Sequence, residues 1–247
     1  MKNDQVKQGL LIGSAGLLAA LILSVSFLIG CAGSQPAETP KQSVPLPRVV
    51  LPADWPVGDR TRLQEPALVF DGLSPLDPQP ADTALTPGVA VAYFYNYFHR
   101  HLNPLTNGKL PNNEGTPGEP ILYLNHEFGR KEVFGSGQNR GVAMRMKGML
   151  RFDKSGSYTL FALSNDGLRI YLDDQLVIDD PEWHARGNQY SKQTIAEITQ
   201  PGWYVLKVEF FQRKGTTALG FYWRRPDSDV IEPVPAEAYA HIPGSAQ

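Results

Sequence analysis

Residues 148–180 read GMLRFDKSGSYTLFALSNDGLRIYLDDQLVIDD, and this stretch decides the fold. Residues 142–152 overlap the start of this stretch. In them, apolar residues alternate with arginine and lysine, which is typical of a strand with one buried face. Residues 158–163 are apolar on both faces and predict a central strand. Leu168, Ile170 and Leu172 then point one way, with Arg169 and Tyr171 pointing the other.

The segments between these strands carry turn residues. Residues 153–157 form one predicted turn, Asn165-Asp166-Gly167 a second, and Asp173-Asp174 a third that leads into a strand at 176–178. Further out, the sequence predicts strands at 89–98, 203–211 and 216–223, and no segment after residue 88 shows helical periodicity. The expected fold class is therefore all-β, an antiparallel β-sandwich or barrel.

Composition limits the function classes. The 247 residues carry 23 Lys and Arg against 25 Asp and Glu, so a formal net charge of -2 argues against a nucleic-acid partner. Cys31 is the one cysteine, which excludes an internal disulfide framework and a cysteine-clustered zinc site.

The amino terminus predicts a membrane address. The run from 9 to 30 has 22 residues and no charge, which is long enough to span a bilayer as a retained anchor. Its end, Leu28-Ile29-Gly30-Cys31, resembles a bacterial lipobox, which implies lipidation of Cys31 and cleavage before it. The alternative is a buried cysteine that closes a transmembrane helix. Ala32 follows instead of Asp, and the resemblance then implies the outer membrane of a bacterial cell envelope more than the inner one.

Between this address and the strands, the sequence predicts a spacer. Residues 32–88 hold 11 of the 21 prolines, as in an extended linker. Leu68, Val69 and Phe70 are a candidate short strand that docks on the domain, and the sequence leaves this open. The expected organisation is a lipoprotein signal peptide at 1–30, a Pro-rich linker at 31–87, a β-sandwich domain at 88–240 and a tail at 241–247.

Ordered motifs between 88 and 240 resemble the PA-fourteen domain family, the β-sandwich named after the amino-terminal piece of anthrax protective antigen. These motifs are 155–160, the turn at 164–167, 172–174, 177–180 with Trp183, 202–204 and 223–226. The family includes fungal adhesins, domains inserted in glycosidases and toxin pieces that serve assembly. Fold alone therefore does not select the function.

The resemblance implies a candidate calcium site. Adhesin members bind sugars through calcium held by two adjacent aspartates near this turn, where this chain has Asn165 and Asp166. An Asn oxygen can ligate calcium with less charge, and Asp173 and Asp174 are candidate further ligands. The alternative is that Asn165 and Asp166 shape the turn through hydrogen bonds to the backbone. Asp179 and Asp180 extend the acidic group, which is equally typical of solvated turns.

Two further side-chain pairs are candidates for binding. Trp183 and His184 could form a sugar platform, although a structural role is expected for an equivalent Trp in many members. His99 and His101 could share one strand face and hold zinc, but the sequence shows no third ligand beside them.

Enzyme signatures are missing from the sequence, so we expect no catalysis by this chain. The sequence predicts a lipid-anchored module that binds a glycan, with calcium as the candidate cofactor. The alternative is an assembly component of the envelope that binds a protein partner without sugar or calcium.

Overall fold

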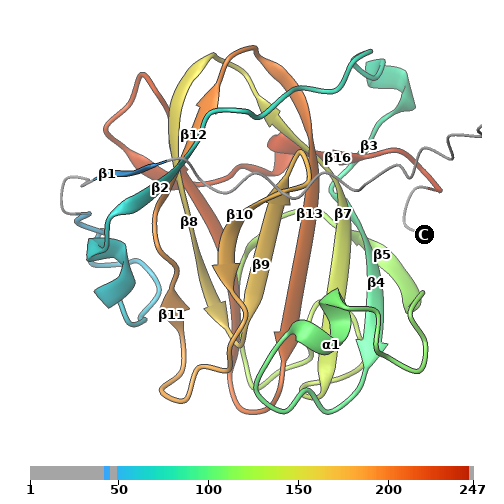
Figure 1. Ribbon diagram of the computed structural model, residues 1–247. Coiled ribbons are helices and arrows are strands. Elements are labelled where there is room, and N and C mark those ends of the chain that lie inside the picture. The colour runs from blue at the N-terminus through green and yellow to red at the C-terminus, as the bar shows by residue number, and fades with distance from the viewer. Residues whose placement is uncertain (1–41, 45–48, 245–247) are drawn as a thin grey trace, which may run out of the picture. The chain divides into compact units, whose positions relative to one another are not determined.

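The computed structural model describes residues 42–44 and 49–244, and within them two eight-stranded sheets face each other (Figure 1). The hydrophobic segment at 9–30 and the candidate lipidation site Cys31 lie outside the described residues. Within the described part of the chain, no helix is long and apolar enough to cross a membrane.

The first sheet is built around the central strand that the sequence predicts. Its path runs β1-β2-β12-β8-β14-β15, with β11 beside β8 and β6 beside β14. All pairings are antiparallel except β12 with β2. Its strands are β1 (Gln42–Val44), β2 (Ala67–Phe70), β6 (Asn125–Gly129), β8 (Gly156–Asn165), β11 (Gln189–Tyr190), β12 (Thr194–Ile198), β14 (Thr217–Arg224) and β15 (Ile231–Pro233).

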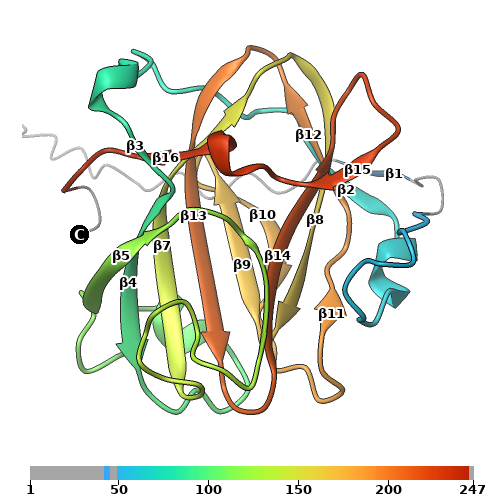
Figure 2. The same cartoon turned by 180° about the vertical axis from the view of Figure 1, so that it is seen from behind.

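The second sheet is antiparallel throughout and runs β10-β9-β13-β7-β16-β3, with β4 beside β7 and β5 beside β4 (Figure 2). Its strands are β3 (Thr86–Pro87), β4 (Val89–Tyr95), β5 (Thr116–Ile121), β7 (Val142–Phe152), β9 (Leu168–Leu172), β10 (Gln175–Asp180), β13 (Gly202–Gln212) and β16 (Tyr239–His241). The strand predicted at 89–98 ends earlier, at Tyr95. Helical turns are α1 (Asn103–Thr106), η1 (Thr61–Gln64), η2 (Asp82–Ala84) and η3 (Ala236–Ala238), so the region after 88 holds one short α-helix that the sequence did not indicate.

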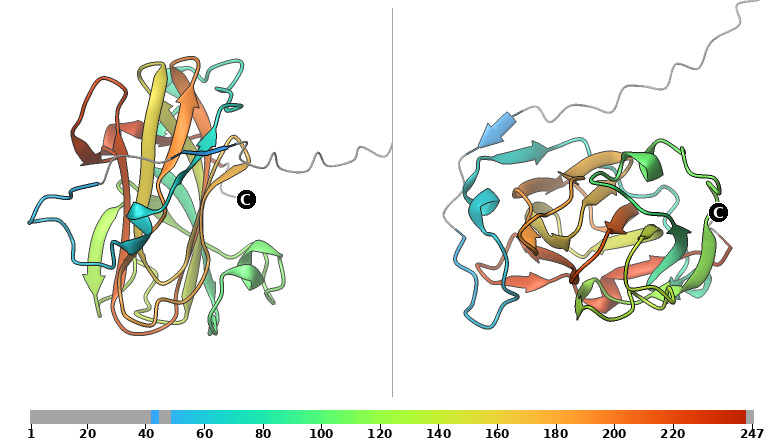
Figure 3. Two further views of the ribbon diagram at one scale, coloured as in Figure 1. Left: turned by 60° about the vertical axis from the view of Figure 1, so that its left-hand side comes forward. Right: turned by 90° about the horizontal axis from the view of Figure 1, so that it is seen from below.

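The core side chains lie between the two sheets, which the left-hand view of Figure 3 shows as two layers. Alternation along β13 places Tyr204, Leu206, Val208 and Phe210 inside, each at most 1% exposed. Around Phe152, aromatic rings pack edge to face, with centroids 4.7 Å from Tyr158 and 5.2 Å from Tyr204.

The segment 49–87, which the sequence assigns to the linker, packs against the sandwich and corrects that boundary. Strand β2 pairs with β12, so the strand left open at Leu68–Phe70 exists. Leu51 and Leu63 are buried with Phe161 and Tyr222 on the outer face of the first sheet. The prolines of this segment do favour extended backbone, as the sequence predicts. Extended backbone can also lie along a sheet instead of forming a free linker.

On the outer face of the second sheet, residues 98–110 form a cover at one end. Phe98, Leu102, Leu105 and Leu110 are buried there with Phe211 at the end of β13. The cover places the residues around His99 next to the loops described below.

Candidate functional site

The strands β4, β8, β10 and β13 all end on the same side of the sandwich, at the bottom of Figure 1. We call this side the loop end and define it by residues 96–115, 130–141, 166–167, 181–188 and 213–216; the right-hand view of Figure 3 looks onto it. Loops carried on a rigid sheet framework are the usual place for binding residues.

Asp166 organises the loop end from inside. Its side chain is buried, with 0% of the residue exposed. One carboxylate oxygen accepts the Arg213 backbone N–H at 2.8 Å and the other accepts the His184 backbone N–H at 3.3 Å. Burial raises the pKa of the Asp166 carboxyl, and the two N–H groups lower it in part. The carboxylate therefore fastens the β10–β11 and β13–β14 loops to the turn after β8.

The turn itself depends on a close backbone approach at Gly167. A Cβ at this position would lie 2.5 Å from the Pro181 carbonyl oxygen and 2.7 Å from the Phe211 ring. Glycine is therefore the residue that lets the β8–β9 turn reach the β10–β11 loop.

His184 is also held inside the protein. Its Nδ1 lies 3.0 Å from the Ser164 carbonyl oxygen, and its Nε2 lies 3.3 Å from Asp180 Oδ2. Burial lowers the pKa of His184, but the contact with Asp180, together with the Ser164 carbonyl and the charge of Asp166, outweighs burial, so the pKa is raised overall. Asp180 also pairs with Arg62 from η1. His184 thus fixes the loop rather than presenting its ring to solvent.

Asn165 points its amide group at neighbouring loops. Its Nδ2 donates to Thr216 Oγ1 at 3.0 Å and to Asn188 Oδ1 at 3.3 Å. The peptide bond between Asn165 and Asp166 is cis. The amide therefore serves as a donor that connects β8 to the loops on both sides.

Trp183 is partly buried and lies against two guanidinium groups. The guanidinium carbons of Arg100 and Arg213 are each 5.1 Å from its ring centroid. The guanidinium carbon of Arg213 also lies 5.2 Å from the ring centroid of Tyr97, a residue that is 46% exposed. The exposed aromatic ring in this group is thus Tyr97, and Trp183 packs beneath the cations.

The PA14 domain family matches residues 87–236. This chain belongs to the PA14 domain family. The PA-fourteen resemblance at 88–240 is therefore confirmed, together with the β-sandwich fold. No curated protein matches the chain.

Solved structures share the PA14 fold at low sequence identity. The PA14 domain of the antifreeze protein MpAFP is 12% identical, with a TM-score of 0.51 over 68% of this chain and 96% of that one. The epithelial adhesin 6 A domain from Candida glabrata, solved with Galβ1-3GlcNAc, is 12% identical, with a TM-score of 0.50 over 66% of this chain and 90% of that one. An anti-sigma factor domain-containing protein from Clostridium clariflavum is 19% identical with a TM-score of 0.48; the match covers 62% of this chain and 47%, about half, of that protein.

The four calcium ligands expected in this PA14 domain do not form one site. Asn165 and Asp166 precede β9, whereas Asp173 and Asp174 follow it at the opposite end of the strand. Positive φ angles of 48° and 59° place Asp173 and Asp174 in the tight β9–β10 turn, and Asp173 accepts the Ser74 backbone N–H. The two pairs are close in sequence, but the full length of β9 separates them in space.

The remaining oxygen ligands at the loop end do not fit a calcium ion either. Calcium requires six to eight oxygen ligands, most of them carboxylate or carbonyl. Asp166 already accepts two backbone N–H groups, and Asn165 presents its donor nitrogen to its neighbours. Among the residues that the structure describes, no three His, Cys, Asp or Glu side chains are grouped to hold a metal.

The other candidates lie in ordinary structural environments. Asp179 forms an ion pair with Arg169 across the β9–β10 ladder, at 2.8 Å. His101 Nδ1 accepts the Asn103 backbone N–H at the start of α1, and the His99 ring contacts the edge of Tyr97. The hypothesis of zinc held by His99 and His101 gains no third ligand within the described ranges.

The sequence interpretation missed a basic pocket at the loop end. The pocket has a volume of about 320 Å³ and is lined by Arg130, Asn139, Arg140, Lys214 and Gly215. The total charge of the chain does not reveal these cations, because basic and acidic residues are nearly equal in number. The signal that could have revealed them is local: residues 130–140 hold three basic residues and one acidic, and residues 213–216 hold two basic and none acidic.

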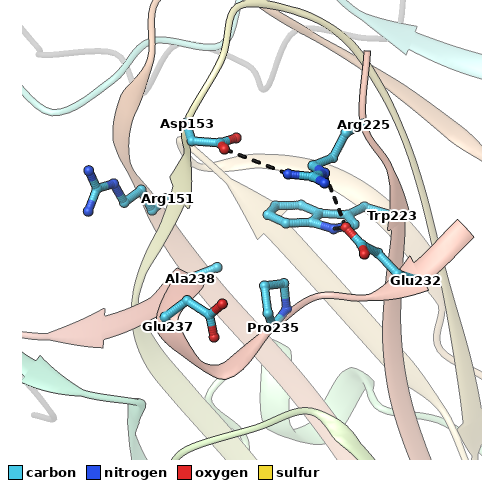
Figure 4. Close-up of a pocket in the computed structure, with 8 residues that line it drawn as sticks. All are labelled: Arg151, Asp153, Trp223, Arg225, Glu232, Pro235, Glu237 and Ala238. Carbon is cyan, nitrogen blue, oxygen red and sulfur yellow. Dashed lines mark hydrogen bonds and ion pairs between the residues drawn. The ribbon is translucent and has the colours of Figure 1, made fainter. Parts of the chain in front are cut away.

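A larger pocket of about 360 Å³ lies toward the opposite end, around Trp223 (Figure 4). There, Arg225 lies across the indole and pairs with Glu232 at 3.1 Å and with Asp153 at 3.8 Å. The indole N–H donates to the same Glu232 carboxylate, and Trp223 is only 4% exposed. The Arg225 charge is paired with Asp153 and Glu232 within the protein, so this cation is less available to a ligand than the cations of the loop end.

Proposed function

We propose that this chain is a carbohydrate-binding module of the bacterial cell envelope, held at the membrane by lipid on Cys31. The observation that carries the binding role is the loop end of a PA14 sandwich. There Asp166 fixes two loops from inside, and the exposed Tyr97 ring and loop side chains face outward. A solved PA14-fold adhesin domain in complex with a disaccharide supports the choice of a sugar ligand.

An exposed aromatic ring suits this ligand because the apolar C–H face of a pyranose packs on it. Tyr97 is held by Arg213 on its ring and by the edge contact with His99, so its orientation is fixed before binding. A fixed ring costs little entropy when the sugar binds.

The experiment is a glycan array probed with the full chain in detergent, followed by titration of each glycan that binds. Tyr97→Ala should weaken binding about threefold to tenfold, as expected for the loss of one aromatic contact. Tyr97→Phe keeps the ring and serves as the matched control. An array without binding, or equal affinities for both variants, would contradict a sugar site at Tyr97.

A second candidate function is assembly with an envelope protein. The buried contacts of Asp166 favour it, because two backbone N–H groups of the same chain occupy its carboxylate where a ligand would otherwise bind. Under this hypothesis no glycan binds, and a partner protein crosslinks to the loop end in intact cells. The glycan array separates the two candidates.

A further inference from the structure

We propose that the basic pocket at the loop end binds an acidic saccharide, one that carries carboxylate or sulfate groups, and that it does so without calcium. This inference rests on the proposed carbohydrate-binding function and specifies its substrate class. It starts from the positions of three exposed cations: Arg130, Arg140 and Lys214.

Backbone pairing places these three cations beside one another. Arg130 follows Gly129, which pairs with Thr217 across β6 and β14. Arg140 precedes Gly141, whose N–H donates to the Arg213 carbonyl oxygen at 3.2 Å. Lys214 lies on the β13–β14 loop between these two attachments. The cluster therefore follows from hydrogen-bonded backbone, not only from the conformations of long side chains.

Ion pairs within the described residues leave these three charges uncompensated. None of the ion pairs found in the described part of the chain includes Arg130, Arg140 or Lys214. The nearest acidic residue in sequence, Glu132, accepts the backbone N–H of Gly137. Clustered like charges repel one another, so a pocket of this kind is stabilised by a bound anion.

Two further groups favour a saccharide over a simple anion. Asn139 lines the pocket and its amide can hydrogen-bond to hydroxyl groups. The exposed Tyr97 ring lies close by, because the Asn96 N–H donates to Gly141 O at 3.0 Å and Arg213 contacts the ring. Cations, an amide and an aromatic face together match the carboxylate or sulfate, the hydroxyls and the C–H face of an acidic sugar.

The same loop explains why calcium is not required. Arg213 donates its backbone N–H to Asp166, and Lys214 follows it in the chain. Positive side chains on this loop repel a divalent cation but attract the anionic groups of the sugar directly. The fixed cations take the place of a metal.

The test uses the full chain in detergent and four probes: a heparin octasaccharide, a hexagalacturonate, the neutral methyl ester of that hexagalacturonate, and a single-stranded oligonucleotide. Affinities are measured in EDTA and in millimolar calcium, at two salt concentrations. We expect the two acidic saccharides to bind more tightly than the neutral ester, to weaken with salt, and to be unaffected by EDTA. The sulfated and carboxylated probes separate the two sources of charge.

The matched variants each remove one arginine and one lysine. R140Q/K214Q changes the pocket, whereas R151Q/K154Q changes exposed residues at the other end of β7 and just beyond it. With about fivefold expected for each charge, R140Q/K214Q should lose at least tenfold in affinity and the control less than twofold. Circular dichroism verifies that both variants fold.

Five results would overturn the inference. Equal binding of the neutral ester, or equal losses in both double variants, would leave a glycan module whose ligand is not selected by this pocket. Loss of binding in EDTA would show that binding depends on calcium. Binding of the oligonucleotide alone would contradict the carbohydrate function as well. Binding of no probe, together with an array on which only neutral glycans bind, would reject the acidic ligand but keep the module.

Discussion

Replacing Asp166 with alanine should mainly destabilise the fold at the loop end. Any effect on ligand binding should follow from that loss of stability. The substitution removes the acceptor of two backbone N–H groups, those of Arg213 and His184, at a residue with no exposed surface. Each buried donor left without a partner costs about 1–3 kcal/mol. We therefore expect Asp166→Ala to lower the free energy of unfolding by about 3–5 kcal/mol, after allowing for partial relaxation of the loops.

The assay is urea unfolding of the full chain, followed by tryptophan fluorescence. The comparison uses the midpoint and the slope, because an unchanged slope shows that the same surface is exposed on unfolding. Asp179→Ala is the control: this carboxylate is half exposed in its ion pair with Arg169, and surface pairs contribute about 0–1 kcal/mol.

A loss of less than about 1 kcal/mol on Asp166→Ala would refute the assignment of Asp166 as the internal fastener. If binding of a glycan then disappeared while stability stayed the same, Asp166 would be a ligand-binding residue. The two roles are thereby distinguished by one pair of measurements.

Three other changes have defined outcomes. The folded-state pKa of His184 is raised, mainly by Asp180 acting against burial. The stabilisation that protonated His184 provides is therefore complete below the ordinary pKa of about 6.5 and is lost as the pH rises through the folded-state pKa. Urea unfolding between pH 6 and 9 should therefore show stability falling by up to about 1.4 kcal/mol per pH unit, with a flatter profile for His184→Gln. Asp174→Gly, at a φ of 59° in the β9–β10 turn, should raise stability by up to about 1 kcal/mol in thermal unfolding and leave glycan affinity unchanged; a loss of affinity would return this turn to the site. Cys31→Ser should abolish incorporation of an alkyne-labelled fatty acid in growing bacteria and release the chain from the membrane fraction, whereas a variant that still carries the label would disprove the lipid site.

The sequence predicted most of the sandwich because its strands carry period-two patterns between strong turn signals. β7, β9 and β13 alternate apolar and polar residues, and Asn165 to Gly167 marks a turn whose glycine is required by a 2.5 Å approach to Pro181. The same reasoning failed at 49–87, because burial of Leu51 and Leu63 depends on contacts with strands about a hundred residues or more away in sequence. No local pattern encodes such contacts.

The candidate site was predictable in part. The sequence named Asn165, Asp166, Trp183 and His184 as candidate binding residues, and in the structure all four lie at or next to the loop end. Their roles differ from the expected ones, since His184 is buried against Asp180 and the Trp183 ring lies against two arginines. These roles depend on partners from loops distant in sequence, and side-chain type alone does not specify a partner.

The basic pocket escaped notice for a related reason. Arg130, Arg140 and Lys214 come from two loops separated by more than seventy residues, and the acidic residues elsewhere in the chain balance them in the total charge. The pairing of β6 with β14 and the backbone hydrogen bond from Gly141 to Arg213 show that they meet.

Hydrogen exchange of the full chain, with and without a glycan identified on the array, tests the location of binding most directly. The account predicts slower exchange in 96–101, 130–141 and 213–216 when the glycan is bound, with no change around Trp223 and Glu232. Protection confined to 223–238, or the same exchange in both states at saturating glycan, would contradict a binding site at the loop end.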